Sequence, residues 1–256
     1  MFDKHFETVL ADTDAGRDIH YRLRYQVYCV EAGYEDPEVF RDEMERDRFD
    51  ENSVHFIVRR KATGDWIAAV RLVVGPLCSL PLSEVARIEP GRISEITAGN
   101  VGNVTRLCAE VSRLCVVSDF RRRIHERKTV YQLAEGPIMR QAEILLRNRR
   151  QAPWIMLGLL RAAREYSLRQ GIFYWFFLVT GSLVRLLQSQ GVDLSVVGQQ
   201  CNHRGIRRPH LGDIRTGFDS LRIKSPAVHG MFFQRPSYRL FSELEEESAR
   251  EIAANE

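Results

Sequence analysis

The stretch VHFIVRRKATGDWIAAVRLVV, residues 54–74, gives the clearest indication of the fold class. It contains two segments rich in β-branched and aromatic residues, 54–60 and 66–74, and Thr63-Gly64-Asp65 between them has the composition of a turn. Two such segments around a glycine-containing turn are typical of a β-hairpin. We therefore expect an antiparallel strand pair inside a sheet.

The segments around the hairpin alternate between strand and helix patterns. Residues 75–105 are punctuated by Pro and Gly, and residues 200–230 are basic and predicted to be mostly loop. The further strands expected are 109–118, 172–179, 192–197 and 231–240. The expected helices are 20–31, a short one near 82–88, 137–150, 153–170 ended by Gly171, 183–190 ended by Gly191, and 242–254. This order predicts an α/β three-layer sandwich with a mixed sheet, in one domain over residues 1–256. Its parts would be an acidic N-terminal segment (about 18–53), a core (about 54–200), and a basic loop with a terminal helix (about 201–256).

Composition excludes several classes of protein. The net charge of +3 does not call for nucleic acid, although residues 121–150 hold nine Arg or Lys against three Glu. That basic patch is either a docking surface for an anionic partner or a solvated helix face. Five cysteines without a CxxC pair fit a reduced cytoplasm. The apolar run at 172–180 is too short to span a bilayer, which leaves only a peripheral membrane contact open.

Charged residues are concentrated between residues 24 and 113. Carboxylates that lie close together raise one another's pKa, and an arginine inside an apolar strand needs an anionic partner. Mutual pairing satisfies both groups, either as a binding site or as a structural ion-pair network without chemistry. The arginines and carboxylates concerned are Arg24, Arg71 and Arg113 with Glu45, Asp47 and Asp50.

Glu110 is the most informative single residue, because it lies inside an apolar strand. Burial should raise its pKa, which suits a general base acting on an amine; the alternative is a structural partner for an arginine. Strand alternation would place Ser112 and Leu114 on the face of Glu110, and Arg113 on the opposite face. Ser112 is then either a hydrogen-bond donor to a substrate or a satisfied core hydroxyl.

The remaining patterns are weaker. Cys201-x-His203 with His210 lacks a second ligand pair, so we expect no metal. An aromatic stripe in the strand 172–179 is typical of a core and could also line a pocket for an acyl chain. Its members are Phe173, Trp175 and Phe177.

The spacing of these residues resembles that of the acyl-homoserine-lactone (autoinducer) synthases. That pattern here comprises Arg24-x3-Tyr28-x5-Tyr34, then Glu45-x-Asp47-x-Phe49-Asp50, then Arg71, then Glu110-x-Ser112-Arg113. The opening YRLRYQVYCVEAGYE (21–35) and the length also look like acyltransferases associated with exosortase/PEP-CTERM systems, which are akin to N-acyl amino acid synthases.

The resemblance implies a GNAT-type fold whose central sheet is split into a V, with an acyl thioester in the split. Glu110 would deprotonate an amine, a backbone N–H near Arg113–Cys115 would stabilise the oxyanion, and the pantetheine would pair with a strand edge. The acidic residues and arginines would bind the acceptor and hold the N-terminal segment as a lid. The expected activity is transfer of a long-chain acyl group to a small amine such as an amino acid, without a bound cofactor.

The donor is either an acyl carrier protein or coenzyme A. The glycine-rich pyrophosphate loop of ordinary acetyltransferases is absent after the strand at 109–118, where Arg121, Arg122 and Arg123 stand instead. Arginines can hold a single phosphate, which favours acyl carrier protein as donor and partner. Two alternatives stay open: an acetyl-coenzyme A-dependent acetyltransferase, and a non-catalytic protein that binds through the 121–150 patch.

Overall fold

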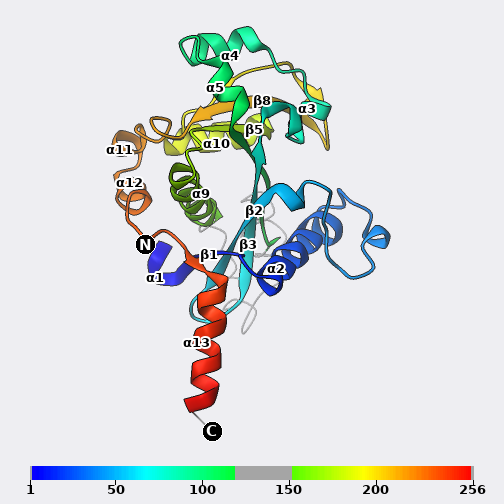
Figure 1. Ribbon diagram of the computed structural model, residues 1–256, viewed down its shortest axis with the longest axis vertical. Coiled ribbons are helices and arrows are strands. Elements are labelled where there is room, and N and C mark those ends of the chain that lie inside the picture. The colour runs from blue at the N-terminus through cyan, green and yellow to red at the C-terminus, as the bar shows by residue number, and fades with distance from the viewer. Residues whose placement is uncertain (1, 119–151, 255–256) are drawn as a thin grey trace, which may run out of the picture.

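The computed structural model describes residues 2–118 and 152–254 (Figure 1). The predicted helix at 137–150, the basic patch at 121–150 and the three arginines 121–123 lie outside the described residues. Within the described residues, no helix has the length and apolar character needed to cross a membrane.

A mixed sheet forms the middle layer of the described chain. Its strand order is β6-β8-β5-β4-β3-β2-β1-β9, and β7 pairs with β8 beside this path. Most neighbours are antiparallel, whereas β4–β5 and β1–β9 are parallel. The strands are β1 (Phe6–Leu10), β2 (Ser53–Arg60), β3 (Trp66–Gly75), β4 (Cys108–Val116), β5 (Tyr174–Val179), β6 (Ser195–Val196), β7 (Cys201–Asn202), β8 (Ile206–Asp213) and β9 (Arg239–Leu240).

Helices cover both faces of this sheet (Figure 1). One face packs against α9, α10 and α12 through the largest apolar cluster. The other face is covered by α3, α4 and α5 around one half and by α2 around the other, where Phe241 and Leu244 at the start of α13 also pack. The helices are α1 (Phe2–His5), α2 (Asp14–Tyr25), the π-helix η1 (Gln26–Glu31), the 3-10 turns η2 (Pro37–Val39), η3 (Asp50–Asn52) and η4 (Leu77–Ser79), α3 (Leu82–Val85), α4 (Pro90–Ile96), α5 (Val101–Arg106), α9 (Ala152–Arg169), α10 (Gly181–Gln190), α11 (Leu221–Lys224), α12 (Pro226–Phe232) and α13 (Phe241–Ala254). The predicted α/β sandwich is confirmed.

The hairpin predicted at 54–74 forms the centre of the sheet. β2 and β3 are antiparallel, with Phe56 opposite Val70 and Ile57 opposite Ala69. All four of these side chains are completely buried, because both faces of the hairpin lie under helices. The hairpin therefore provides the rigid support for the strand that follows it, β4.

The central sheet is split between β4 and β5. These parallel strands pair only through Ala109 with Trp175 and Glu110 with Phe176. Beyond Glu110 the two strands separate, and the residues that follow it on β4 line a cavity together with Leu178 and Val179 of β5. The V-shaped split predicted for the sheet is thus present, and Glu110 lies at its apex.

Several predicted boundaries were wrong. The helix expected at 20–31 begins at Asp14, where the side chain of Thr13 caps the amide of Gly16, and it continues as a π-helix to Glu31. The strand expected at 192–197 keeps only two strand residues, and most of 231–240 is not strand. The segment 206–213, predicted as loop, is the eight-residue strand β8 between β5 and β6. Pro209 and the adjacent arginines make this segment look unlike a strand in the sequence, but pairing with neighbouring strands on both sides stabilises a strand there.

Candidate active site

A β-bulge in β4 shapes the site. Ala69 pairs with Cys115 and Arg71 with Ser112, so two residues, Arg113 and Leu114, lie opposite the single residue Val70. Arg113 has a φ of +51°, a left-handed conformation that is uncommon for a residue other than glycine. A bulge re-aims the side chains that follow it. The alternation predicted for this strand was therefore wrong: Arg113 joins Glu110 and Ser112 at the cavity, and Leu114 also packs against the α9-side core.

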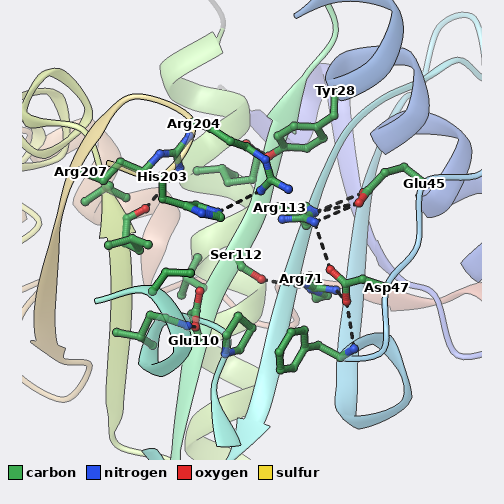
Figure 2. Close-up of a pocket in the computed structure, with 18 of the residues that line it drawn as sticks. Tyr28, Glu45, Asp47, Arg71, Glu110, Ser112, Arg113, His203, Arg204 and Arg207 are labelled. Atoms are coloured by element: carbon green, nitrogen blue, oxygen red, sulfur yellow. Dashed lines mark hydrogen bonds and ion pairs between the residues drawn. The ribbon is translucent and has the colours of Figure 1, made fainter. Parts of the chain in front are cut away.

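Three arginines from three elements meet three carboxylates of the acidic segment. Figure 2 shows the part of this network that Arg71 and Arg113 form with Glu45 and Asp47. Arg24 of α2 donates to Glu45 at 2.5 Å and to Asp50 at 2.6 Å. Arg71 of β3 donates to Asp47 at 2.6 Å and to Asp50 at 2.8 Å. Arg113 donates to Glu45 and to Asp47, each at 3.0 Å. The expected pairing of these six residues is present, and their formal charges cancel.

The network keeps its carboxylates ionised. Burial raises the pKa of Asp50, but Arg24 and Arg71 outweigh burial and lower that pKa to about 2. Glu45 also has a lowered pKa, because Arg24 and Arg113 oppose the effect of its burial. Buried ion pairs are costly to break singly, so the network fixes the acidic segment against the sheet.

Glu110 is in the opposite electrostatic situation. Burial raises the pKa of its carboxyl to about 7, against a smaller lowering by the backbone amide of Leu82 and by Arg71. That amide donates to Oε2 of Glu110 at 2.7 Å. Arg71 and Arg113, which favour the ionised form of Glu110, are themselves paired with other carboxylates, and their effect on its pKa is smaller than that of burial. A carboxyl with a pKa near 7 can accept or return a proton at neutral pH.

Ser112 and Tyr28 are held by the same network. Arg71 Nε donates to the hydroxyl of Ser112 at 3.1 Å, which leaves the hydroxyl hydrogen available to another acceptor. The hydroxyl of Tyr28 donates to the carbonyl of Leu114 at 3.4 Å, and its ring lies 5.5 Å from the guanidinium of Arg113. Burial raises the pKa of Tyr28 to about 12, so its hydroxyl stays protonated.

A cavity of about 350 Å³ unites these groups. Its lining includes Glu110, Ser112 and Arg113 from β4, and apolar side chains from β5 and α10. Predicted residues found in the lining are Tyr28, Glu45, Asp47, Arg71, Glu110, Ser112 and Arg113. Arg24 and Asp50 do not line the cavity, but they form ion pairs with each other and with residues that do. Tyr34 packs on Tyr28 and is half exposed.

The structure does not place the three predicted acyl-pocket aromatics in the cavity lining. Trp175 and Phe177 point into the core under α9, where the indole N–H of Trp175 donates to Ser167 at 3.0 Å. Phe173 is partly exposed, and the guanidinium of Arg215 lies 5.1 Å from its ring. The apolar walls of the cavity come instead from Leu178, Val179 and Leu183.

The sequence assigned no role to the basic segment 200–230, whereas in the structure the hairpin of β7 and β8 within it is part of the site. Its tip places His203, Arg204 and Arg207 in the cavity lining (Figure 2). Arg204 pairs with Glu35 of the N-terminal segment and so joins the two sides of the cavity mouth. Gly205 was the available signal in the sequence, because glycine marks a possible tight turn; in the structure both Arg204 and Gly205 have positive φ.

No group of His, Cys, Asp and Glu side chains suited to a metal occurs among residues 2–118 and 152–254. His203 and His210 come from the same strand pair, but Cys201 completes no ligand set with them in the described chain.

Comparisons with known proteins agree with this geometry. Residues 23–129 match the profile of an acetyltransferase (GNAT) domain. A comparison with curated protein sequences gives no match. Among solved structures, the chain is similar to BjaI, a CoA-dependent acyl-homoserine lactone synthase bound to SAM and isopentyl-CoA, with a TM-score of 0.55 and 17% identity over 92% of each chain.

Two further structures show the same fold. TofI in a complex with an inhibitor and MTA has a TM-score of 0.54 and 18% identity, over 87% of this chain and 99% of that one. FeeM, an N-acyl amino acid synthase from uncultured soil microbes, has a TM-score of 0.53 and 12% identity, over 86% and 96%. The described chain thus has the GNAT fold of acyl-transferring enzymes, and its charged cavity lies in the split of that fold.

Proposed function

We propose that this protein is an N-acyltransferase that moves an acyl group from a thioester to the amine of a small acceptor. The observation that carries the proposal is Glu110, a buried carboxyl with a pKa of about 7 at the apex of the split between β4 and β5. The GNAT profile and the fold shared with acyl-homoserine lactone and N-acyl amino acid synthases support the same class of reaction.

The reaction follows from the groups around the cavity. The neutral amine of the acceptor attacks the thioester carbonyl carbon, and as the N–C bond forms the ionised carboxylate of Glu110 takes the proton that the nitrogen loses. Backbone N–H groups of the bulge at Arg113–Cys115 stabilise the oxyanion of the tetrahedral intermediate. As the intermediate collapses, the C–S bond breaks, the amide forms, and protonated Glu110 returns its proton to the departing thiolate.

The donor lies along the split. Past Glu110 the edge of β4 that faces β5 is not paired with β5, and a pantetheine arm could add to that edge as an extra strand. Leu178, Val179 and Leu183 provide apolar contacts for the acyl chain. We propose a long-chain acyl group carried by acyl carrier protein, with Arg121–Arg123 as the docking residues, and coenzyme A as the alternative carrier.

The acidic segment acts as a preorganised wall for the acceptor. Its carboxylates are fixed by the three buried arginines, so the acceptor meets a rigid surface rather than a mobile loop. We further propose that residues 1–256 act as one domain in the cytoplasm, with peripheral membrane contact through an acylated product. The association with exosortase systems is a prediction from the N-terminal motif.

Cells that produce the wild-type protein or Glu110→Gln would be compared by mass spectrometry of lipid extracts. We expect an acylated amine only with the wild type, and Glu95→Gln, an exposed carboxylate paired with Arg92, serves as the matched control. Equal product from wild type and Glu110→Gln would contradict the assigned role of Glu110.

A second candidate, acetyl-coenzyme A-dependent acetylation, is favoured by the acetyltransferase profile at residues 23–129. Acyl-chain preference separates the two candidates. If acetyl thioesters are used in preference to thioesters of eight or more carbons, the acetyltransferase is the better description.

A further inference from the structure

The tip of the β7–β8 hairpin faces the charged network across the cavity. β7 and β8 pair through Cys201 with Arg207 and Asn202 with Ile206, and the turn is closed by the amide of His203 donating to the carbonyl of Gly205 at 3.0 Å. This turn places cationic and imidazole side chains in the lining of the same cavity as Glu110 (Figure 2).

Arg207 differs from every other arginine of the lining that projects from a strand. Arg71 and Arg113 are matched by carboxylates, whereas Arg207 has no carboxylate within 4.0 Å among the residues described. Its Nη1 donates only a long 3.4 Å bond to the carbonyl of Leu178, and its buried Nε has no partner in this part of the chain. A partly buried guanidinium with unused donors is costly unless an anion occupies the space beside it.

The neighbours of Arg207 reinforce the local positive charge. Arg204 Nη1 lies 3.2 Å from Nε2 of His203, so this imidazole nitrogen accepts and the ring is neutral. Burial lowers the pKa of His203, and Arg204 and Arg207 lower it further. Glu35 of the N-terminal segment, the carboxylate that reaches this hairpin from across the cavity mouth, is already paired with Arg204. Among the residues that the structure describes, Arg207 is therefore a guanidinium of this hairpin that is not neutralised by a carboxylate.

We propose that Arg207, supported by His203 and Arg204, binds a carboxylate of the acceptor while the acceptor amine faces Glu110. This inference rests on the proposed N-acyl transfer and names its acceptor class: small amino acids, which carry an amine and a carboxylate on one short skeleton. Arginine suits this role because its planar fork can donate two parallel hydrogen bonds to one carboxylate.

A donor phosphate shares the same oxyanion chemistry. In a pantetheine donor, however, the whole pantetheine arm separates the phosphate from the thioester, so the phosphate lies outside a cavity that holds the reacting carbonyl. Arg207 lines the same cavity as Glu110, which favours the acceptor carboxylate.

The test uses the full-length protein and a donor that has no phosphate, dodecanoyl-N-acetylcysteamine. Free amino acids are compared with the corresponding amino-acid amides as acceptors, by thiol release, for wild type, Arg207→Gln, Arg207→Lys and Arg208→Gln. Arg208 is the matched control, because it is the next arginine on β8, is exposed and is not in the cavity lining.

We expect Arg207→Gln to raise KM for free amino acids by roughly 10- to 100-fold, the effect of losing a charged hydrogen-bonded pair. KM for the amides should change little, Arg207→Lys should restore part of the difference, and Arg208→Gln should resemble wild type. Equal effects on acids and amides would overturn the proposal. A loss seen only with acyl carrier protein or acyl-coenzyme A donors would also overturn it, in favour of a phosphate site.

A binding measurement separates failure of this inference from failure of the proposed function. Thermal unfolding is followed with two product-like probes, N-dodecanoylglycine and N-dodecanoylglycinamide. If wild type turns over no acceptor, the proposed function fails. The anion site would still be supported if N-dodecanoylglycine raises the unfolding temperature of wild type more than the amide does, and if this difference is lost in Arg207→Gln. Equal stabilisation by both probes in wild type would overturn it.

Discussion

The backbone amide of Leu82 donates a 2.7 Å hydrogen bond to Oε2 of Glu110. This bond joins the start of α3 to the apex of the split and fixes the orientation of a carboxyl that has no ion pair among residues 2–118 and 152–254. The bond favours the ionised carboxylate, but burial outweighs it, and the pKa of Glu110 is about 7. The orientation and the protonation equilibrium of this residue are therefore set by different parts of its surroundings.

The raised pKa of Glu110 predicts a pH-dependent loss of stability. A carboxyl with a folded-state pKa of about 7 and an ordinary pKa of 4.5 binds more protons in the folded state than in the unfolded state. Its contribution to the free energy of unfolding is therefore present below pH 4.5 and is lost as pH rises through 7. Glu110→Gln cannot ionise. Its free energy of unfolding, relative to wild type, should increase by about 3 kcal/mol between pH 4 and pH 8. Urea unfolding at both pH values measures this, and a constant difference would contradict the raised pKa.

The shared carboxylate Asp50 should be important for stability. Arg24 and Arg71 both donate to its Oδ1, and the two guanidiniums are buried. Asp50→Ala should lower the free energy of unfolding by about 3–5 kcal/mol, because it leaves buried cations with too few partners.

The matched control is the exposed pair of Arg92 and Glu95. Glu95→Ala should change the free energy of unfolding by less than about 1 kcal/mol, since solvent screens this pair. If denaturation curves show similar small effects for Asp50→Ala and Glu95→Ala, the network does not hold the acidic segment as described.

A buried histidine pair should make the protein sensitive to acid. The rings of His20 and His55 lie 4.5 Å apart, and burial lowers the pKa of both, that of His55 to about 4. A histidine in the unfolded chain has its ordinary pKa of 6.5, so below that pH the unfolded chain binds more protons than the folded one. The stability that the two neutral histidines contribute is therefore present above pH 6.5 and is lost as pH falls toward 4. His55→Gln should therefore lose about 3 kcal/mol less than wild type between pH 7 and pH 4. Parallel curves for the two proteins would show that His55 protonates freely in the fold.

Two helical glycines should respond oppositely to alanine. A Cβ at Gly158 of α9 would lie 2.4 Å from the ring of Phe2, whereas a Cβ at Gly102 of α5 would meet nothing within 4 Å. Gly158→Ala should therefore destabilise the protein by about 1–3 kcal/mol through overpacking. Gly102→Ala should stabilise it by up to about 1 kcal/mol, because alanine favours a helix. Thermal unfolding gives both signs, and stabilisation by Gly158→Ala would contradict the packing of α1 on α9.

The sequence predicted the features that depend on local pattern. The hairpin at 54–74, α9 and the burial of Glu110 follow from apolar periodicity and from charges placed inside apolar strands. The pairing of Arg71 with acidic residues follows because a buried arginine requires an anion.

The remaining features depend on contacts between distant segments. Arg113 turns toward the cavity because β4 has one residue more than β3 at the bulge, which strand alternation cannot anticipate. β8 is a strand because β5 and β6 pair with it, despite Pro209. Arg207 reaches the cavity only because that strand folds back beside β5.

The role of Glu110 as general base is tested most directly by the pH dependence of kcat/KM for aminolysis of an acyl thioester, measured by thiol release for wild type and Glu110→Gln. Wild-type kcat/KM should rise with pH to a plateau, with a midpoint near 7, as Glu110 ionises. Glu110→Gln should be slower by roughly 10²–10⁴-fold and should lack that midpoint. A Glu110→Gln protein with the same midpoint and a comparable rate would contradict the assignment of Glu110 as the general base.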